Sequence, residues 1–173
     1  MDHVVLVNEQ DEELGVMEKM EAHQKAVLHR AFSVFIFNEK KDMLLQQRAL
    51  SKYHSPSLWT NACCSHPKPG ESVESAAVRR LQEELGFTTT LKPIFSFIYK
   101  ASFDNGLTEH EFDHVLIGEY NGNLFPNPSE VMSTRYVPVE QIETQLTEEP
   151  ANYTAWFTIA FPKVVEWLKN NHR

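Results

Sequence analysis

The clearest hydrophobic pattern in this chain lies near its middle, just after a Pro/Gly turn at residues 67–70. Four apolar residues recur there at intervals of four positions: Val73, Ala77, Leu81 and Leu85. This spacing predicts a helix with one apolar stripe. Gly86 stands where a helix commonly ends in a left-handed residue, so we expect the helix to end there.

A second face of the same helix is charged. Arg80, Glu83 and Glu84 are spaced i, i+3 and i+4, so they lie together on it. On most helices such a group is a set of solvated ion pairs. Here the helix directly follows a segment that holds both cysteines of the chain and His66. The sequence thus brings a thiol, an imidazole and carboxylates toward one end of one helix.

Other periodic segments predict strands on both sides of this helix, because they are rich in aromatic and β-branched residues. The predicted strands are residues 4–7, 32–37, 43–48, 88–100, 109–120 and 135–137, with 32–37 and 43–48 joined as a hairpin. Residues 9–15 are typical of a turn, 16–28 are partly helix-compatible, and 138–146 and 155–168 predict two further helices. The pattern predicts an α+β domain with a mixed β-sheet flanked by helices.

Composition agrees with one globular domain over residues 1–173, because 42% of the residues are hydrophobic and 23% are charged. The net charge of −8 argues against general nucleic-acid binding. A local cluster of cations would still suit a small phosphorylated ligand. No apolar run approaches the roughly 20 residues of a membrane helix, and the first residues lack the features of a signal peptide. We therefore expect a soluble, cytoplasmic protein without a membrane partner, and make no prediction of oligomeric state.

The two cysteines are adjacent, which bears on both their redox state and their orientation. Cys63 and Cys64 cannot form a normal disulfide without distorting the backbone, so we expect free thiols in a reducing compartment. In an extended segment, adjacent side chains point to opposite faces. Cys64 and His66 would then share one side, and Cys63 would face away. A thiolate zinc site formed by these three residues is a weak alternative, because the cysteines lack the usual spacing.

Two acidic residues on one predicted strand suggest a metal site. Glu109 and Glu111 project to the same face, and two carboxylates so close repel each other unless a cation lies between them. Solvated acids on an edge strand are the plainer interpretation. His23, His29 and His66 are available to the same cation. Three imidazoles and two carboxylates would suit a five- or six-coordinate divalent ion.

Cations near a predicted turn suggest a phosphate site. Arg48 and Lys52 are four residues apart, and Lys19 and Arg80 are candidates to join them. Clustered Arg and Lys bind phosphate well, although each alone is usually an ordinary surface cation. Tyr99 and Trp156 are by themselves more typical of packing than of catalysis.

Residues 65–87 resemble the Nudix box, G-x₅-E-x₇-R-E-U-x-E-E-x-G-U, in which U is aliphatic. The residues that fall on the box are Glu71, Arg79, Leu81, Glu83, Glu84 and Gly86. Ser65 replaces the first glycine, and Arg80 replaces the first glutamate of R-E-U-x-E-E. Nudix hydrolases use that glutamate to hold the metals that activate water. The second departure therefore argues against the usual hydrolysis.

Further segments resemble one branch of this superfamily, the type I isopentenyl-diphosphate Δ-isomerases. They are A-H-x₄-L-H-R-A-F at residues 22–32, R-A-L-S-K at 48–52, W-T-N-x-x-C-x-H-P at 59–67 and E-x-E at 109–111. The resemblance implies a layered α/β/α Nudix fold. It also implies conversion of isopentenyl diphosphate into dimethylallyl diphosphate in isoprenoid biosynthesis. A Nudix hydrolase and a non-catalytic Nudix ligand sensor are the alternatives.

The resemblance also implies roles for single residues. One divalent ion, Zn²⁺ or Mn²⁺, would be bound by His23, His29, His66, Glu109 and Glu111. A Mg²⁺ that arrives with the substrate diphosphate would meet Glu84, and the diphosphate itself would contact Lys19, Arg48, Lys52 and Arg80. Cys64 and Glu111 would transfer the protons, Tyr99 would hydrogen-bond to Glu111, and Trp156 would stabilise a carbocation.

Overall fold

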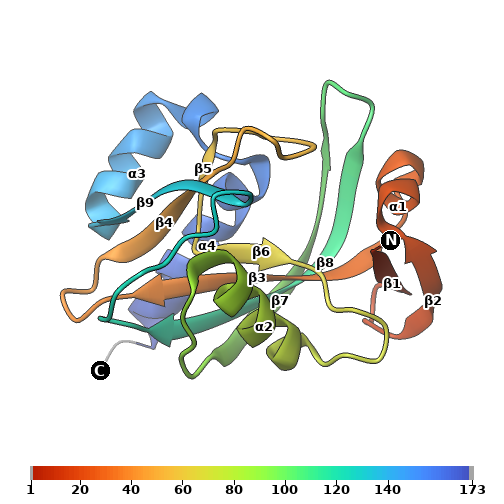
Figure 1. The fold of residues 1–173 in the computed structure, drawn as a ribbon, viewed down its shortest axis with the longest axis horizontal. Coiled ribbons are helices and arrows are strands. Elements are labelled where there is room, and N and C mark those ends of the chain that lie inside the picture. The colour runs from red at the N-terminus through yellow and green to blue at the C-terminus, as the bar shows by residue number, and fades with distance from the viewer. Residues whose placement is uncertain (1, 172–173) are drawn as a thin grey trace.

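The computed structural model describes residues 2–171 (Figure 1). Within them, one nine-stranded sheet contains β1 (His3–Val7), β2 (Glu13–Glu18), β3 (His29–Phe37), β4 (Met43–Arg48), β5 (Trp59–Thr60), β6 (Cys63–Ser65), β7 (Lys92–Ser102), β8 (Thr108–Glu119) and β9 (Val131–Val137). The helices are α1 (Lys19–Lys25), α2 (Val73–Leu85), α3 (Val139–Glu148) and α4 (Ala155–Asn170), with a 3₁₀ turn at Pro150–Asn152. Over this described range, no helix is both long and apolar enough to cross a membrane.

The sheet is built around β3. This strand pairs in parallel with β8, in a register that places His29 opposite Glu111 and Phe37 opposite Glu119. On its other side β3 pairs antiparallel with β6, while β7 and β8 form a long antiparallel hairpin. Parallel and antiparallel pairs therefore occur in one sheet, which confirms the predicted mixed topology.

The predicted hairpin between β3 and β4 is correct only at its turn. The two strands share a single pair, Phe37 with Met43. Beyond that pair, β4 binds β9 and β5 instead. The two strands separate because β6 takes the edge of β3 that a longer hairpin would have used.

Helices cover both faces of the sheet, and alternation along β3 explains which core each face forms. Phe32, Val34 and Ile36 pack with the apolar stripe of α2. Phe35 and Phe37 belong to a second core with α3 and α4. In Figure 1, α2 lies in front of the sheet and α4 crosses behind it. This arrangement confirms the layered α+β fold.

The prediction for residues 9–28 was right about a turn and a partly helical segment but missed a strand between them. The turn is short and is closed by Asn8, whose side-chain oxygen accepts hydrogen bonds from the backbone N–H groups of Gln10 and Glu12. Strand β2 follows at once and pairs with β1, and the helix is only the seven-residue α1. Strand β2 is half-exposed along its whole length, so its sequence shows no clear alternation of buried apolar and exposed polar residues. The strand is held at the edge of the sheet by its pairing with β1 and not by burial of an apolar face.

Helix α2 begins and ends as predicted. Ser72 caps its N-terminus by accepting a hydrogen bond from the N–H of Ser75, and Gly86 ends it in the left-handed region with φ of 74°. A Cβ at Gly86 would lie 2.6 Å from Cβ of Phe125. Position 86 therefore needs glycine for its backbone conformation and for close packing.

We expect Gly86→Ala to destabilise the protein more than Gly70→Ala does. Gly70 also has a positive φ, but a Cβ added there would have nothing within 4 Å, so alanine should cost only the roughly 1–2 kcal/mol of a left-handed L-residue. Overpacking at position 86 should add about 1–3 kcal/mol. Urea unfolding of both variants and the parent measures the difference, and equal losses would contradict the role given to Phe125.

Candidate active site

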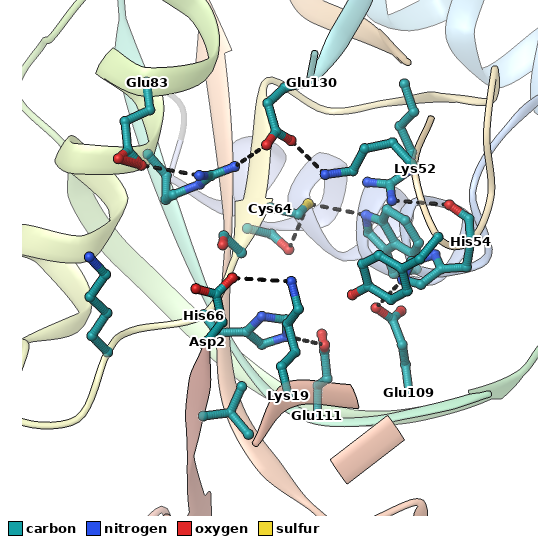
Figure 2. A pocket seen from close by; sticks show the side chains of 18 of the residues that line it. Asp2, Lys19, Lys52, His54, Cys64, His66, Glu83, Glu109, Glu111 and Glu130 are labelled. Carbon is teal, nitrogen blue, oxygen red and sulfur yellow. Dashed lines mark hydrogen bonds and ion pairs between the residues drawn. The ribbon is translucent and has the colours of Figure 1, made fainter. Parts of the chain in front are cut away.

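A cavity of about 220 Å³ lies where the edge of the sheet meets α1, α2 and the start of α4 (Figure 2). Strands β6, β7 and β8 supply Cys64, Ser65, Tyr99, Glu109 and Glu111 to its lining, and His66 follows β6. Strand β4 supplies Arg48, and the helices and loops supply Lys19, Lys52, Tyr53, His54, Lys68, Arg79, Arg80, Glu83, Glu130 and Trp156. Segments far apart in the sequence thus contribute to one wall.

The floor of the cavity holds two buried carboxylates. Glu109 and Glu111 lie two residues apart on β8, on the same face, and each is 5% exposed. Tyr99 on β7 lies opposite Glu111 in the register, and its Oη is 2.8 Å from Glu109 Oε1 and 2.7 Å from Glu111 Oε1. A hydroxyl has one proton, so it can fully satisfy only one of them. The pair therefore needs further positive charge nearby.

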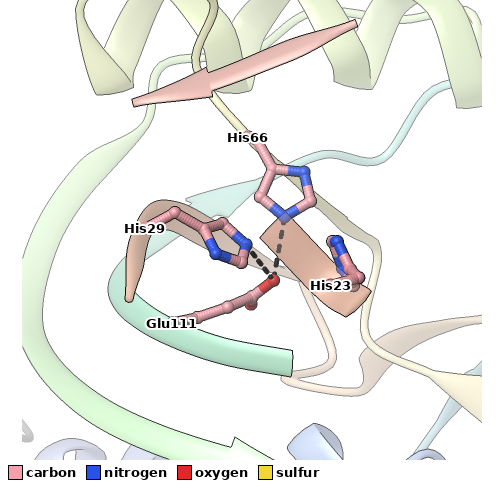
Figure 3. A group of neighbouring side chains, drawn as sticks. All are labelled: His23, His29, His66 and Glu111. Carbon is pink, nitrogen blue, oxygen red and sulfur yellow. Dashed lines mark hydrogen bonds and ion pairs between the residues drawn. The ribbon is translucent and has the colours of Figure 1, made fainter. Parts of the chain in front are cut away.

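Three imidazoles lie around the carboxylate of Glu111 (Figure 3). The Nε2 atoms of His66 and His29 lie 2.8 Å and 3.3 Å from Glu111 Oε2. His23 Nε2 lies 3.8 Å from Glu109 Oε2. One ligand atom each from His23, His29, His66 and Glu111 falls within 4.8 Å of the others, which is a spacing that a shared metal ion can bridge.

The rings of His23 and His29 are held by their other nitrogen. His23 Nδ1 lies 2.7 Å from the carbonyl oxygen of Lys19, and His29 Nδ1 lies 2.8 Å from that of Val27. A carbonyl only accepts, so each Nδ1 carries the proton and each Nε2 presents a lone pair to the carboxylates. His29 Nε2 is buried without a hydrogen-bond partner. These orientations make the cluster compatible with a divalent metal ion.

The pKa shifts of Glu111 and Tyr99 agree with this arrangement of imidazoles around buried carboxylates. Burial alone would raise the pKa of Glu111, but the charge of His66, its hydrogen bond and the nearby His29 outweigh it, so the pKa lies well below its ordinary value. Burial, and then the charges of Glu109 and Glu111, hold the pKa of Tyr99 well above its usual range. Tyr99 therefore remains a protonated hydrogen-bond donor, and Glu111 remains a carboxylate.

The two cysteines point in opposite directions. In the register of β6, Cys64 lies opposite Ser33 and Cys63 opposite Val34. Cys63 is fully buried in the core beside α2, whereas Cys64 lines the cavity together with His66. Both are free thiols. The alternation predicted from the sequence is confirmed.

Polar neighbours orient the Cys64 thiol. Trp156 Nε1–H donates to its sulfur at 3.1 Å, and Asn61 Oδ1 lies 3.1 Å from it on the accepting side. The amide nitrogen of Asn61 donates to the carbonyls of Val34 and Cys63, which fixes the direction of Oδ1. Burial raises the pKa of Cys64. The group is thus a neutral thiol, able to donate a proton.

Cations gather on the other walls of the cavity. The Arg80 guanidinium lies between Glu83, Glu84 and Glu130, and Lys52 pairs with Glu130. Arg48 stacks over the Trp156 ring at 5.1 Å, and its Nε is buried without a hydrogen-bond partner. Lys19 lies 3.5 Å from Asp2. A cavity with so many cations, one of them with an unused donor, suits an anionic ligand.

Glu84 differs from the other candidate residues because it lies behind the cavity wall. It is 4% exposed and accepts hydrogen bonds from Arg80 at 2.9 Å and from Gln46 at 3.0 Å. The thiol of Cys63 donates to the same oxygen that Arg80 contacts, at 3.4 Å. Its carboxylate is therefore fully engaged in this structure, and Arg80 is the group that separates it from the cavity.

Comparison with known proteins relates this cavity to one family. The NUDIX domain family matches residues 27–157. The isopentenyl-diphosphate Δ-isomerase of Pectobacterium atrosepticum is 47% identical over 167 residues, which cover 96% of this chain and 93% of the relative. The enzyme of that name from Burkholderia multivorans is 44% identical over 156 residues, covering 90% and 89%. The chain belongs to the isopentenyl-diphosphate Δ-isomerase family.

Solved structures show the same fold at low sequence identity. A crystal structure from Deinococcus radiodurans has a TM-score of 0.71 at 19% identity and covers 86% of this chain and 90% of its own. A MutT protein from Methanosarcina mazei Go1 has a TM-score of 0.68 at 19% identity, with coverage of 84% and 96%. The isomerase family sequence therefore adopts the Nudix fold, as the resemblance implied.

The isomerase family motifs did not reveal every polar residue of the site. His54, Ser33 and Asp113 were missed. His54 belongs to an irregular loop and has no periodic signal, and Ser33 reaches the site only through its register with Cys64. Asp113 was detectable, because it continues the two-residue alternation of Glu109 and Glu111; its Oδ2 accepts a hydrogen bond from Ser33 at 2.7 Å.

We expect His66→Ala to weaken binding of Co²⁺ by more than about 100-fold, which exceeds the usual effect of an outer-shell partner. The reason is that His66 Nε2 directly faces Glu111 Oε2. Protein stripped with a chelator would be titrated with Co²⁺ against a competing chromophoric chelator. His114→Ala is the matched control, because His114 lies on the opposite face of β8 and pairs with Asp11. Equal affinities in the two variants would contradict a metal site at these residues.

Proposed function

We propose that this chain converts isopentenyl diphosphate into dimethylallyl diphosphate. Membership of the isomerase family supports this reaction. The observation that carries it is the shared cavity of a neutral thiol, Cys64, and a buried carboxylate, Glu111, with several cations on its walls. Such a cavity offers two proton-transfer groups to an apolar chain and positive charge to the diphosphate at its end.

The reaction moves one double bond by adding a proton and removing another. A proton is added to the terminal methylene, which becomes a methyl group and leaves a tertiary carbocation. A proton then leaves the neighbouring CH₂, and its electron pair forms the new double bond. Cys64 and Glu111 act on opposite faces of the alkene, one donating and the other accepting. The two groups exchange protonation states in each turnover and re-equilibrate with solvent afterwards.

Two aromatic residues assist these proton transfers. Tyr99 donates a hydrogen bond to Glu111 and holds it in place. The Trp156 indole fixes the thiol of Cys64 through its N–H. The electron-rich ring of Trp156 stabilises the developing carbocation.

A divalent ion, Zn²⁺ or Mn²⁺, is held by the three imidazoles of His23, His29 and His66 and by Glu109 and Glu111. This N/O donor set suits five or six coordination. The bound ion would balance the charge of the buried carboxylates, so that Glu111 can gain and lose a proton without leaving an isolated charge. Support comes from the close ligand atoms and from the unpartnered Nε2 of His29.

The diphosphate is bound by Lys19, Arg48, Lys52 and Arg80. The buried, unpartnered Nε of Arg48 supports this assignment. Glu84 would meet a Mg²⁺ that accompanies the diphosphate. Arg80 covers Glu84 at 2.9 Å, so this guanidinium would have to turn from Glu84 toward the phosphates, and the ion would supply the charge balance.

Arg80 also weighs against a hydrolase. It stands at the position where Nudix hydrolases carry a metal-binding glutamate, and it neutralises Glu83 and Glu84 on the same face of α2. A guanidinium there opposes the binding of metals that activate water. No observation in the described residues favours a non-catalytic sensor over an enzyme, because the thiol and Glu111 both face the cavity.

The test is incubation of the purified protein with Mg²⁺ and isopentenyl diphosphate in D₂O, followed by NMR. We expect dimethylallyl diphosphate with solvent deuterium in the new methyl group, because the added proton comes from groups that exchange with water. Release of inorganic phosphate or a monophosphate would favour hydrolysis, and binding without turnover would favour a sensor. Either result would remove the proposal.

Cys64→Ala should lower the isomerase rate by at least the ~10²–10⁴-fold typical of general acid–base catalysis. Cys63→Ala is the matched control, since it removes the adjacent thiol from the core beside α2 and should affect stability at most. Both variants should keep their metal content, because neither thiol is a proposed ligand. Near-parental turnover in Cys64→Ala would contradict the assignment.

A further inference from the structure

His54 is a buried histidine at the site to which neither the motifs nor the reaction above assign a role. It lies in the loop between β4 and β5 and is 3% exposed. Its Nε2 is 3.1 Å from Glu109 Oε2, on the wall of the same cavity (Figure 2). This nitrogen is buried and has no hydrogen-bond partner. His54 Nε2 and Glu109 Oε2 are therefore close to each other but are not aligned for a hydrogen bond, and this arrangement needs an explanation.

His29 is in the same situation on the other carboxylate. Its Nε2 lies 3.3 Å from Glu111 Oε2 and is likewise buried without a hydrogen-bond partner. In both cases an imidazole nitrogen and a carboxylate oxygen approach closely but do not bond to each other. This is the geometry of two donors directed at a common cation, because both lone pairs then point to a third position.

The ligand atoms around Glu109 form a second compact group, which shares His23 with the group around Glu111. One atom each from His23, His54 and Glu109 lies within 4.8 Å of the others, and all three residues are buried. On the Glu111 side, His29 and His66 occupy the corresponding places. Each carboxylate is therefore flanked by two imidazoles through Oε2, while Tyr99 bonds to both Oε1 atoms.

The ring of His54 is held in this direction by its packing. It stacks on Phe103 with centroids 4.6 Å apart and planes 4° from parallel, and it meets Tyr53 and Trp156 edge-on. Its backbone carbonyl accepts a hydrogen bond from Arg48. A ring fixed on several sides is preorganised, as a ligand must be to avoid a large ordering cost on binding.

We propose that His54 is a metal ligand of this chain, which binds a divalent cation together with His23 and Glu109. The inference rests on the metal centre of the proposed function and extends it beyond the five residues named there. Imidazole and carboxylate donors suit Zn²⁺, Co²⁺ or Mn²⁺. The metal-loaded protein holds either one ion with six protein ligands or two ions with three protein ligands each, and both arrangements include His54. The number of ions per chain, measured by metal analysis, distinguishes the two.

The experiment is a Co²⁺ titration of the chelator-stripped, full-length protein, followed by visible absorption and by competition with a chromophoric chelator. His54→Ala removes the imidazole. His54→Gln keeps an N–H donor at a similar reach, so it can donate a hydrogen bond to Glu109 but replaces the imidazole by a weak amide ligand. His114→Ala, on the far face of β8, controls for the loss of a histidine elsewhere.

We expect both His54 variants to bind Co²⁺ at least about 10-fold more weakly or in smaller amount, with altered d–d bands, while His114→Ala behaves as the parent. Parental affinity and spectrum in His54→Gln would overturn the proposal, because His54 would then act only as a hydrogen-bond donor that positions Glu109. The same parental behaviour in His54→Ala would exclude both roles. Circular dichroism and thermal unfolding of each stripped variant identify any that fails to fold, and if His54→Ala does so, His54→Gln carries the test.

The metal measurements do not depend on turnover. If the protein fails to isomerise isopentenyl diphosphate but His54→Gln loses Co²⁺ binding, the ligand assignment stands and the proposed function falls. If turnover is found and His54→Gln binds Co²⁺ as the parent does, the proposed function stands and the ligand assignment falls. The two proposals are thus tested separately.

Discussion

The burial of two neighbouring carboxylates on β8 is the constraint on which the site depends. β8 lies between β3 and β7, so Glu109 and Glu111 cannot turn toward water. Two unit charges about 4 Å apart repel by roughly 4 kcal/mol at the effective dielectric typical of proteins. The structure meets this cost with imidazoles and one tyrosine hydroxyl. The short α1 ends at Ala26 in a left-handed conformation, and this sharp end brings His23 and His29 to the same place.

The Nudix scaffold is retained here while the chemistry of its central helix changes. Arg79 pairs with Glu71, at 2.8 Å and 2.9 Å, and so joins the middle of α2 to the turn that precedes the helix. Arg80 then occupies the acidic face where metals for hydrolysis would bind. A single guanidinium thus covers Glu84 in this structure and forms part of the cavity wall. The fold is independent of this change, because Arg80 is not part of the apolar stripe.

The two faces of β6 have different roles: one adjacent cysteine packs in the core, and the other lines the cavity. Cys63 fills the core beside α2, and Cys64 enters the polar cavity with Trp156 and Asn61 around it. The strand is only three residues long, so its register with β3 alone decides which thiol is accessible. A shift by one residue would exchange the two roles. The fixed orientation of Asn61, set by its bonds to two carbonyls, therefore matters as much as the thiol itself.

Local periodicity by itself determined α2 with its glycine end, the strands with strong alternation, and the opposite orientations of Cys63 and Cys64, because these features depend on residues close together in the chain. The motifs also identified the family and many of the residues that line the cavity. Only the tertiary structure decided that β2 is a strand, that β4 leaves β3 after one pair, and that Glu84 lies behind Arg80. These depend on which strand edges meet and on what covers each side chain. His54 belongs to the same group: a histidine in an irregular loop has no pattern of its own, and its meaning comes from the 3.1 Å approach to Glu109, on a strand far along the chain.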